Sequence, residues 1–284
     1  MTVIGLGPMG RALAGAFLKN GHPTTVWNRS AEKADELVAQ GAAKADTVAD
    51  AILASPLVIV CVLDYNVVHS ILKHAGDALK GRTLVNLTGG SPSWAREMAE
   101  WAAKGDIDYL DGSIIVPTIG ESSASILYSG PEDVYQTHQT TLASLGGTST
   151  HLGKDPGLAA AYDTALLDIF WTSMIGYVHA LALARAENIS VIDLVPYAQG
   201  IVGMMPDVMS VFAHQVESGQ YPGEESNITS TAAVLENLIH TSKTLNLDVG
   251  VLNAAKATVQ HAIDLGYGAN DFSRLTEVIK KSSM

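Results

Sequence analysis

The stretch Val3-Ile4-Gly5-Leu6-Gly7-Pro8-Met9-Gly10 decides the fold that the sequence predicts, because it places G-x-G-x-x-G between a β-branched run and a helical pattern. Gly5 permits a tight turn, Gly7 lets the backbone approach a pyrophosphate, and Gly10 lets helix and strand pack closely. Amides at the start of the helix then bind the phosphates. An accidental glycine turn is the alternative, and the flanking strand and helix disfavour it.

A second predicted strand, Thr24–Trp27, ends in Asn28-Arg29-Ser30, where an acidic residue would bind a ribose 2′-hydroxyl. Arg29 can bind a 2′-phosphate bidentately, Ser30 can donate a hydrogen bond, and Lys33 adds charge one turn into the next helix. A carboxylate at position 28 would repel that phosphate, so the sequence favours NADPH/NADP+ over NAD(H). The alternative is that Arg29 and Lys33 form only a solvated helix start.

Two later strand ends, Val62-Leu63-Asp64 and Asn86-Leu87-Thr88, should complete the nucleotide crevice, because ligands of open parallel sheets lie outside the carboxyl ends of the strands. Each has an ordinary alternative: Asp64 can cap the helix after Tyr65, and Thr88-Gly89-Gly90 can form a turn. The predicted cofactor-binding residues are therefore Gly5, Leu6, Gly7, Pro8, Met9, Gly10, Asn28, Arg29, Ser30, Lys33, Val62, Leu63, Asp64, Asn86 and Thr88.

The pattern along the chain predicts an α/β fold in three parts. Residues 1–156 alternate strands and helices, as in a Rossmann domain with a parallel sheet; residues 157–187 form one long interdomain helix; residues 188–284 form an all-α domain for dimerisation and substrate binding. The predicted strands are Thr2–Gly5, Thr24–Trp27, Leu57–Val62, Thr83–Leu87, Tyr109–Ile114 and Ile126–Tyr128. The predicted helices of the first domain are Pro8–Asn20, Ala31–Gln40, Val48–Leu53, Val67–Ala78, Pro92–Lys104 and one opened by Pro131.

Composition narrows the class of protein. Hydrophobic residues make up 47% of the chain and charged residues 16%, which is typical of a globular protein. The net charge of -12 argues against nucleic acid or an anionic membrane as partner, because both are negatively charged. The single cysteine, Cys61, has no intrachain partner and fits a reducing, cytoplasmic setting. No metal site is predicted.

The helix expected at Gly157–Glu187 is apolar nearly all round and must therefore be buried nearly all round. We predict that a second copy packs against it in a two-fold homodimer; the alternative is that the helices of Val191–Lys280 wrap it within one chain. Its apolar stretch Ile169–Ala184 falls short of the roughly 20 residues needed to span a bilayer, so a soluble protein is expected.

Asp163 is the candidate catalytic residue, because a reductase needs an acid or an anion near the carbon that receives hydride. It projects from an apolar stripe, and burial there would raise its pKa toward neutrality. Asp168, five residues on, is rotated by roughly 140° and cannot face the same cleft. The alternative for Asp163 is an early-turn residue that complements the helix dipole.

The residues taken together resemble the imine reductase family of the β-hydroxyacid dehydrogenase superfamily, over essentially the whole chain. The resemblance rests on the glycine fingerprint and on Trp27-Asn28-Arg29-Ser30, Val85-Asn86-Leu87-Thr88, Tyr109-Leu110-Asp111-Gly112, Tyr162-Asp163 and Leu238-Ile239-His240. It implies a domain-swapped homodimer with the active site between one subunit's Rossmann domain and its partner's helices. It also implies an aspartate-type member in which Asp163 donates a proton or anchors the iminium.

Departures from hydroxyacid dehydrogenases agree with this resemblance. Those enzymes carry a lysine about four residues beyond a glycine as this helix begins, whereas no lysine occurs here between Lys154 and Lys243. Their acid-binding Ser-Gly-Gly is replaced by Ile114-Ile115-Val116-Pro117. A carbonyl needs a proton donor, but a protonated imine already carries its activating charge and gains from a nearby carboxylate.

The resulting prediction is reduction of a small-molecule (cyclic) imine to an amine with hydride from NADPH. The alternatives are an NADP-dependent carbonyl or β-hydroxyacid dehydrogenase, and a non-catalytic NADP(H)-binding sensor. Trp171 falls near a pocket position that is often tyrosine in related reductive aminases, so reductive amination is a weaker expectation. The candidate substrate-pocket residues, each with an ordinary core alternative, are Trp171, Met174, Met204, Met205, Phe212 and His240.

Overall fold

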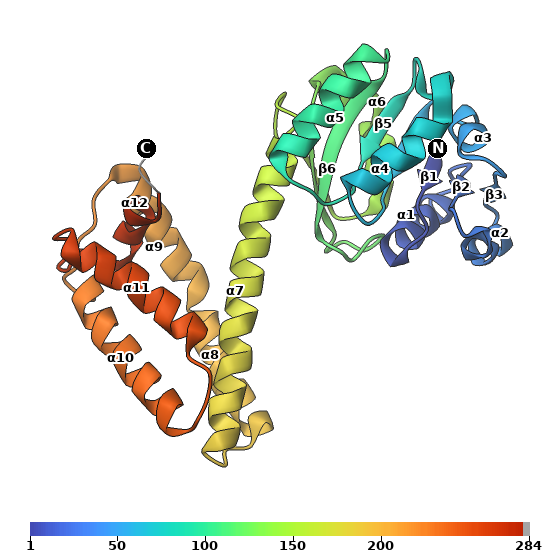
Figure 1. The fold of residues 1–284 in the computed structure, drawn as a ribbon. Coiled ribbons are helices and arrows are strands. Elements are labelled where there is room, and N and C mark those ends of the chain that lie inside the picture. Colours follow the sequence, from blue (N-terminus) through green and yellow to red (C-terminus); the bar gives the residue numbers. More distant parts are fainter. Residues whose placement is uncertain (281–284) are drawn as a thin grey trace. The chain divides into compact units, whose positions relative to one another are not determined.

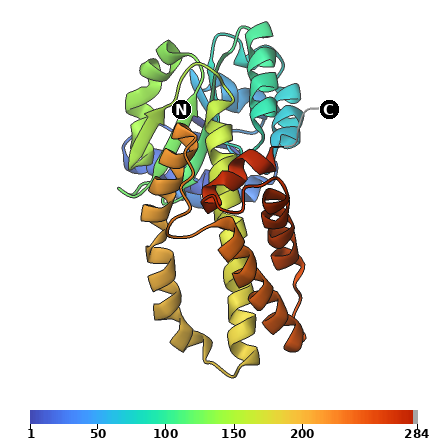
Figure 2. The same cartoon turned by 90° about the vertical axis from the view of Figure 1, so that its left-hand side faces the viewer.

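The computed structural model describes residues 1–280, and the chain divides into two compact units, Met1–Phe170 and Trp171–Met284. The first unit is α/β, and the described part of the second contains helices and no strand (Figures 1 and 2). The boundary between the units falls inside the long helix α7. The division into 1–156, 157–187 and 188–284 stays a prediction.

An eight-stranded sheet forms the centre of the first unit, in the order β3-β2-β1-β4-β5-β6-β7-β8. Its strands are β1 (Thr2–Ile4), β2 (Thr25–Trp27), β3 (Ala43–Lys44), β4 (Leu57–Val60), β5 (Thr83–Asn86), β6 (Asp108–Val116), β7 (Ser125–Ser129) and β8 (Thr148–His151). All neighbours pair parallel except β6 and β7, which pair antiparallel. The strand order reverses between β1 and β4, where ligands of such sheets bind.

Helices cover both faces of the sheet (Figure 1). Alternate strand residues point to opposite faces, so neighbours in β1 pack in different layers. Val3 belongs to the layer of α1 (Pro8–Lys19), α2 (Asp35–Ala39) and α6 (Glu132–Leu142), and Ile4 to that of α3 (Val48–Leu53), α4 (Tyr65–Leu72) and α5 (Pro92–Lys104). Both side chains are fully buried, which stabilises the fold by about 1.5–3 kcal/mol each.

The structure confirms most predicted elements of this unit. Helices α3 and α5 have the predicted bounds, and every predicted strand is present with ends that differ by at most two residues. The helix predicted at Ala31–Gln40 is instead a 3-10 turn (η1, Ala31–Ala34) followed by α2. The one predicted at Val67–Ala78 starts earlier, at Tyr65, and its end is a 3-10 segment (η2, Lys73–Leu79) kinked at Gly76, whose φ is 54°.

Helix α7 (Leu158–Ala186) is one helix of 29 residues, as the sequence predicts. At its start, Asp155 accepts a hydrogen bond from the Gly157 amide at 3.0 Å and pairs with Arg96 of α5 at 2.7 Å. With a mean hydropathy of 1.4 over 18 residues, α7 is long and apolar enough to cross a membrane. This finding concerns length and composition only, and core helices of soluble proteins have the same features, so the expected soluble protein stays a prediction.

The second unit has a small core of its own. Its helices after α7 are α8 (Val191–Gly203), α9 (Met205–Ser218), α10 (Ile228–Thr244), α11 (Gly250–Asp264), η4 (Phe272–Arg274) and α12 (Leu275–Ile279). Ile228 of α10, Ala262 of α11 and Leu275 of α12 pack together and are buried. Helices α8 and α9, by contrast, contain no buried residue. Their apolar side chains therefore lack cover within the described part of this chain.

Candidate active site

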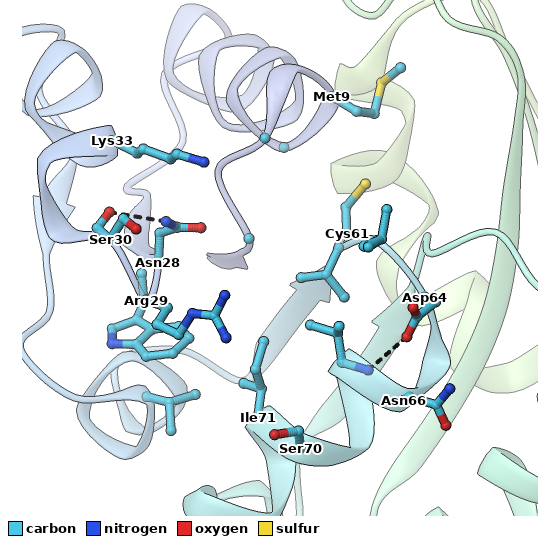
Figure 3. Close-up of a pocket in the computed structure, with 18 of the residues that line it drawn as sticks. Met9, Asn28, Arg29, Ser30, Lys33, Cys61, Asp64, Asn66, Ser70 and Ile71 are labelled. Atoms are coloured by element: carbon cyan, nitrogen blue, oxygen red, sulfur yellow. Dashed lines mark hydrogen bonds between the residues drawn. The ribbon is translucent and has the colours of Figure 1, made fainter.

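A cavity of about 850 Å³ lies in the first unit, where the loops that follow β1, β2 and β4 meet (Figure 3). It therefore occupies the place where the strand order reverses. Among its lining residues are twelve of the fifteen predicted for the cofactor, namely Gly5, Gly7, Pro8, Met9, Gly10, Asn28, Arg29, Ser30, Lys33, Val62, Leu63 and Asp64. The site forms at the predicted edge of the sheet.

The glycine turn has no room for side chains at two positions. A Cβ on Gly10 would lie 1.8 Å from the Gly5 carbonyl oxygen, and a Cβ on Gly5, whose φ is 93°, would lie 2.2 Å from the Cys61 carbonyl oxygen. Gly7 has nothing within 4 Å of that position, so its backbone is open to the cavity. Pro8 begins α1, whose N-terminal amides and dipole favour an anion. This cradle fits a pyrophosphate.

Asn28 braces the glycine turn. Its Oδ1 accepts a hydrogen bond from the Leu6 amide at 2.9 Å, and its Nδ2 donates to the Ser30 carbonyl at 3.0 Å. The side chain lines the cavity, but its polar atoms are occupied by the protein's own backbone. Leu6 itself is fully buried in the apolar core and does not line the cavity, and its assignment to the cofactor stays a prediction.

Positive charge gathers at one end of the cavity. Figure 3 shows Arg29, Ser30 and Lys33 on one side, with Asp64 and Asn66 on the opposite side. Among residues 1–280, no carboxylate lies within ion-pair distance of Arg29 or Lys33. Two cations and a hydroxyl around one end of a cavity can bind a phosphate group.

The later strand ends behave differently from one another. Asp64 lines the cavity, and its Oδ1 also caps α4 by accepting a hydrogen bond from the Val67 amide at 2.9 Å. Thr88 and Asn86 are buried and do not line the cavity, and their assignment to the cofactor stays a prediction. Thr88 Oγ1 accepts from the Val62 amide at 3.1 Å, and Asn86 Oδ1 accepts from the Thr88 amide at 3.1 Å. The two side chains thus stabilise the loops that follow β4 and β5.

One wall of the cavity is formed by residues that were not predicted from the sequence. Val67, Ser70, Ile71 and His74 line the cavity from α4 and the turn after it. Their spacing of i, i+3, i+4 and i+7 puts them on one helix face, and this periodicity is the signal that could have identified them. The remaining lining residues not predicted are Trp27, Val48, Cys61 and Asn66. Burial raises the pKa of the Cys61 thiol to about 11, so it stays protonated at neutral pH.

Asp163 lies in the second turn of α7 and is half-buried, and this burial raises the pKa of its carboxyl group above its ordinary value. The apolar side chains at helical spacing from it are exposed in the single chain, for example Leu166 at 40% and Leu167 at 45%. The dry niche expected around Asp163 is therefore only partly formed by the described residues of its own unit.

A second carboxyl group, Asp111 of β6, is buried close by. Its Oδ1 accepts hydrogen bonds from the hydroxyls of Tyr65, at 2.5 Å, and Tyr109, at 2.8 Å. Asn86 Nδ2 donates to the Tyr109 hydroxyl at 3.3 Å. Burial is the largest cause that raises the pKa of Asp111, to about 7, and the negative charge of Asp163 adds to it. Asp111 is not among the site residues predicted from the sequence.

The six candidate pocket residues all belong to the second unit. Five are exposed, namely Trp171, Met174, Met204, Met205 and His240, whereas Phe212 is half-buried and stacks on Phe272 with ring centroids 6.3 Å apart. Their role in a substrate pocket stays a prediction. The described residues contain no cluster of three or more His, Cys, Asp or Glu suited to a metal ion.

Comparison with known proteins identifies both halves of the chain. Residues 1–153 match the NAD binding domain of 6-phosphogluconate dehydrogenase, and residues 155–281 match the C-terminal domain of NADPH-dependent reductive aminase-like proteins. The NADPH-dependent reductive aminase of Aspergillus oryzae (strain ATCC 42149 / RIB 40) is 36% identical, over 98% of this chain and 96% of its own.

Solved structures agree over the same length. The imine reductase from Myxococcus stipitatus in complex with NADP+ has a TM-score of 0.94 at 36% identity, covering 98% of this chain and 99% of its own. The reductive aminase from Aspergillus terreus in complex with NADPH and ethyl levulinate has a TM-score of 0.94 at 38% identity, covering 98% of each chain. The chain therefore belongs to the family of imine reductases and NADPH-dependent reductive aminases.

Proposed function

We propose that this protein reduces the C=N bond of small imines, cyclic imines among them, to amines with NADPH as the reductant. The observation that carries the proposal is the half-buried carboxyl group of Asp163 at the start of a helix where no lysine is available. A carboxylate stabilises a cation, and an iminium is the cationic form of an imine. The relatives named as imine reductases and reductive aminases support the same chemistry.

The cavity of the first unit fits NADPH. Gly7 and the first amides of α1 would hold the pyrophosphate, while Arg29, Ser30 and Lys33 would hold the 2′-phosphate. The charges of the cavity suit those of the cofactor, because the two parts of the cavity that would bind phosphate groups contain no carboxylate. When bound, NADPH supplies the hydride that the reduction consumes.

Asp163 can serve the reaction in either of two protonation states. As an anion it stabilises the iminium, which brings its own proton; as a neutral acid it donates that proton to the imine nitrogen. In both cases the product is an amine that has gained one hydride at carbon and one proton at nitrogen. Burial raises the pKa of Asp163, so the neutral form is more accessible than for an ordinary carboxyl group, while the anionic form remains the one that can stabilise an iminium.

The proposed function also includes assembly as a homodimer. Exposed apolar side chains run along α7, including Phe170 at 52%, Ile175 at 51% and Val178 at 64%. Helices α8 and α9 add further exposed apolar residues and contain no buried residue. A second copy would remove this surface from water. Light scattering after size-exclusion chromatography should give twice the chain mass of 29.8 kDa.

The test of the reaction is NADPH consumption with 1-pyrroline, compared with a ketone at the same concentration. Asp163→Asn should lower turnover of the imine by roughly 100-fold or more if it acts as a general acid. Asp168→Asn is the matched control, since it makes the same change on the same helix, rotated by roughly 140°, and should leave turnover unaffected. Unchanged turnover in Asp163→Asn, or faster turnover of the ketone than of the imine, would contradict the proposal.

A further inference from the structure

Asp111 is a buried titratable group that the proposed reaction does not yet use. Only 1% of the residue is exposed, and two tyrosine hydroxyls converge on the same oxygen, Oδ1. A carboxylate with two donors on one oxygen can be replaced by an asparagine amide oxygen without loss of either hydrogen bond. An ionisable group is therefore not needed to tie Tyr65 and Tyr109 together, and its presence calls for another reason.

The surroundings of Asp111 connect it to the reaction site. Tyr65 directly follows Asp64, which lines the cofactor cavity, and it packs in the same buried apolar cluster as Tyr109 and Ala160 of α7. Asp163 lies three residues after Ala160, close to one helical turn, so the two share a helix face. The Asp111 network and Asp163 therefore lie on either side of the Ala160 contact, near enough for the charge of Asp163 to act on Asp111.

The charges around Asp111 show how the two carboxyl groups interact. Burial disfavours its charge most strongly, the hydroxyls of Tyr65 and Tyr109 and the amide of Asn86 stabilise the charge, and the charge of Asp163 opposes it. These groups come from α4, β5, β6 and α7, and no lysine or arginine of the described chain is among them. Electrostatic coupling is reciprocal, so a charge on Asp111 must equally disfavour one on Asp163.

We propose that Asp111 is a positioning residue that acts through Asp163: the two carboxyl groups form a coupled pair that keeps one proton, which resides on Asp111 while Asp163 carries the single negative charge. The pair would then match the single positive charge of an iminium. This inference rests on the role proposed for Asp163. It explains why the more deeply buried carboxyl group needs hydroxyl donors and no cationic partner.

Loss of the proton that remains on Asp111 changes the net charge of the pair, and this change can be measured. Because the pKa of Asp111 is about 7, the pair should pass from one negative charge to two as the pH rises through neutrality. A permanently cationic ligand should therefore bind more tightly above this pH, by about 5-fold or more for a typical coupling. Removing the Tyr65 donor should move the transition to higher pH, because that hydroxyl stabilises the charged form.

The first experiment follows the aspartate carboxyl groups of the full chain by ¹³C NMR as the pH is raised from 4 to about 9. The wild type should show a carboxyl group that titrates near neutrality, and Asp111→Asn should lack it. In Asp163→Asn this titration should move to lower pH, and in Tyr65→Phe to higher pH. A titration that stays unchanged in Asp163→Asn would show that the two groups are not coupled and would overturn the proposal.

The second experiment measures binding of N,N-dimethylpyrrolidinium, a permanent cation, to the NADP+-loaded protein across the same pH range. Affinity should rise through neutrality in the wild type and stay flat in Asp111→Asn. A flat profile in the wild type would contradict the placement of the pair at the substrate site. Absence of imine turnover together with a coupled titration would refute the proposed function and leave the pair intact, so the two failures are distinguishable.

Discussion

Asn28→Asp tests whether the cationic end of the cavity selects NADPH. The introduced carboxylate keeps the acceptor for the Leu6 amide, loses the donor to the Ser30 carbonyl, and adds a negative charge beside Arg29 and Lys33. Two unit charges about 4 Å apart interact by about 4 kcal/mol at an effective dielectric constant of about 20. If the separation from a phosphate bound between Arg29 and Lys33 is taken as about 8 Å, the same relation leaves about 2 kcal/mol, and screening by solvent reduces this to about 1–2 kcal/mol.

This penalty corresponds to a Kd for NADPH that rises about 5- to 30-fold, since 1.4 kcal/mol is a factor of about 10. NADH lacks the 2′-phosphate, so its Kd should stay constant or fall. Fluorescence titration of both nucleotides gives the ratio of the two constants. Asn66→Asp is the matched control, because it makes the same change in charge on the opposite side of the cavity and should leave the ratio unchanged (Figure 3). An unchanged ratio in Asn28→Asp would refute phosphate binding by this end.

Three further predictions concern the fold around the site. Gly10→Ala should abolish nucleotide binding, measured by the same titration, because its Cβ would lie 1.8 Å from a backbone oxygen; retained affinity would contradict the cradle. Leu84→Ala should lower the free energy of unfolding by about 2–5 kcal/mol in urea, because the side chain is fully buried in β5. The Arg96 guanidinium and the Gly157 amide lower the pKa of Asp155, so this carboxylate stabilises the fold above its unfolded pKa and loses that effect as pH falls. Asp155→Asn should therefore melt at a lower temperature than the wild type at pH 7, and the difference should shrink toward pH 3; a constant difference would argue against the ion pair.

Local sequence patterns were sufficient to predict most helices and strands of the first unit. The buried strands read as continuous apolar runs, and the caps and prolines around α3 and α5 fixed the ends of both helices. Strand β3 was missed because it has only two residues, both exposed, and β8 because three of its four residues are Thr or Ser. Short edge strands of this kind take their conformation from the neighbouring strand, and their own sequence carries little signal.

The candidate site was predictable where one segment supplies several residues. The glycine turn and the Arg29 region line the cavity as expected, whereas Asn86 and Thr88 turn inward to satisfy buried backbone groups. That choice depends on the depth of a side chain in the sheet, which strand position does not reveal. The hydrogen-bond network of Asp111 could not be predicted for a related reason. Its members come from α4, β5 and β6, and only the folded structure brings them together.

The first strand also limits how this protein can evolve in length. Val3 and Ile4 face opposite layers, and Gly5 follows at once with its amide bonded to the Trp27 carbonyl at 3.0 Å. Inserting or deleting one residue here would move each side chain of β1 to the other face of the sheet. The same change would displace the glycine turn from its position at the end of the strand. Natural and engineered variants should therefore accept indels in exposed loops, such as the one around Glu121, and almost none between Thr2 and Gly10.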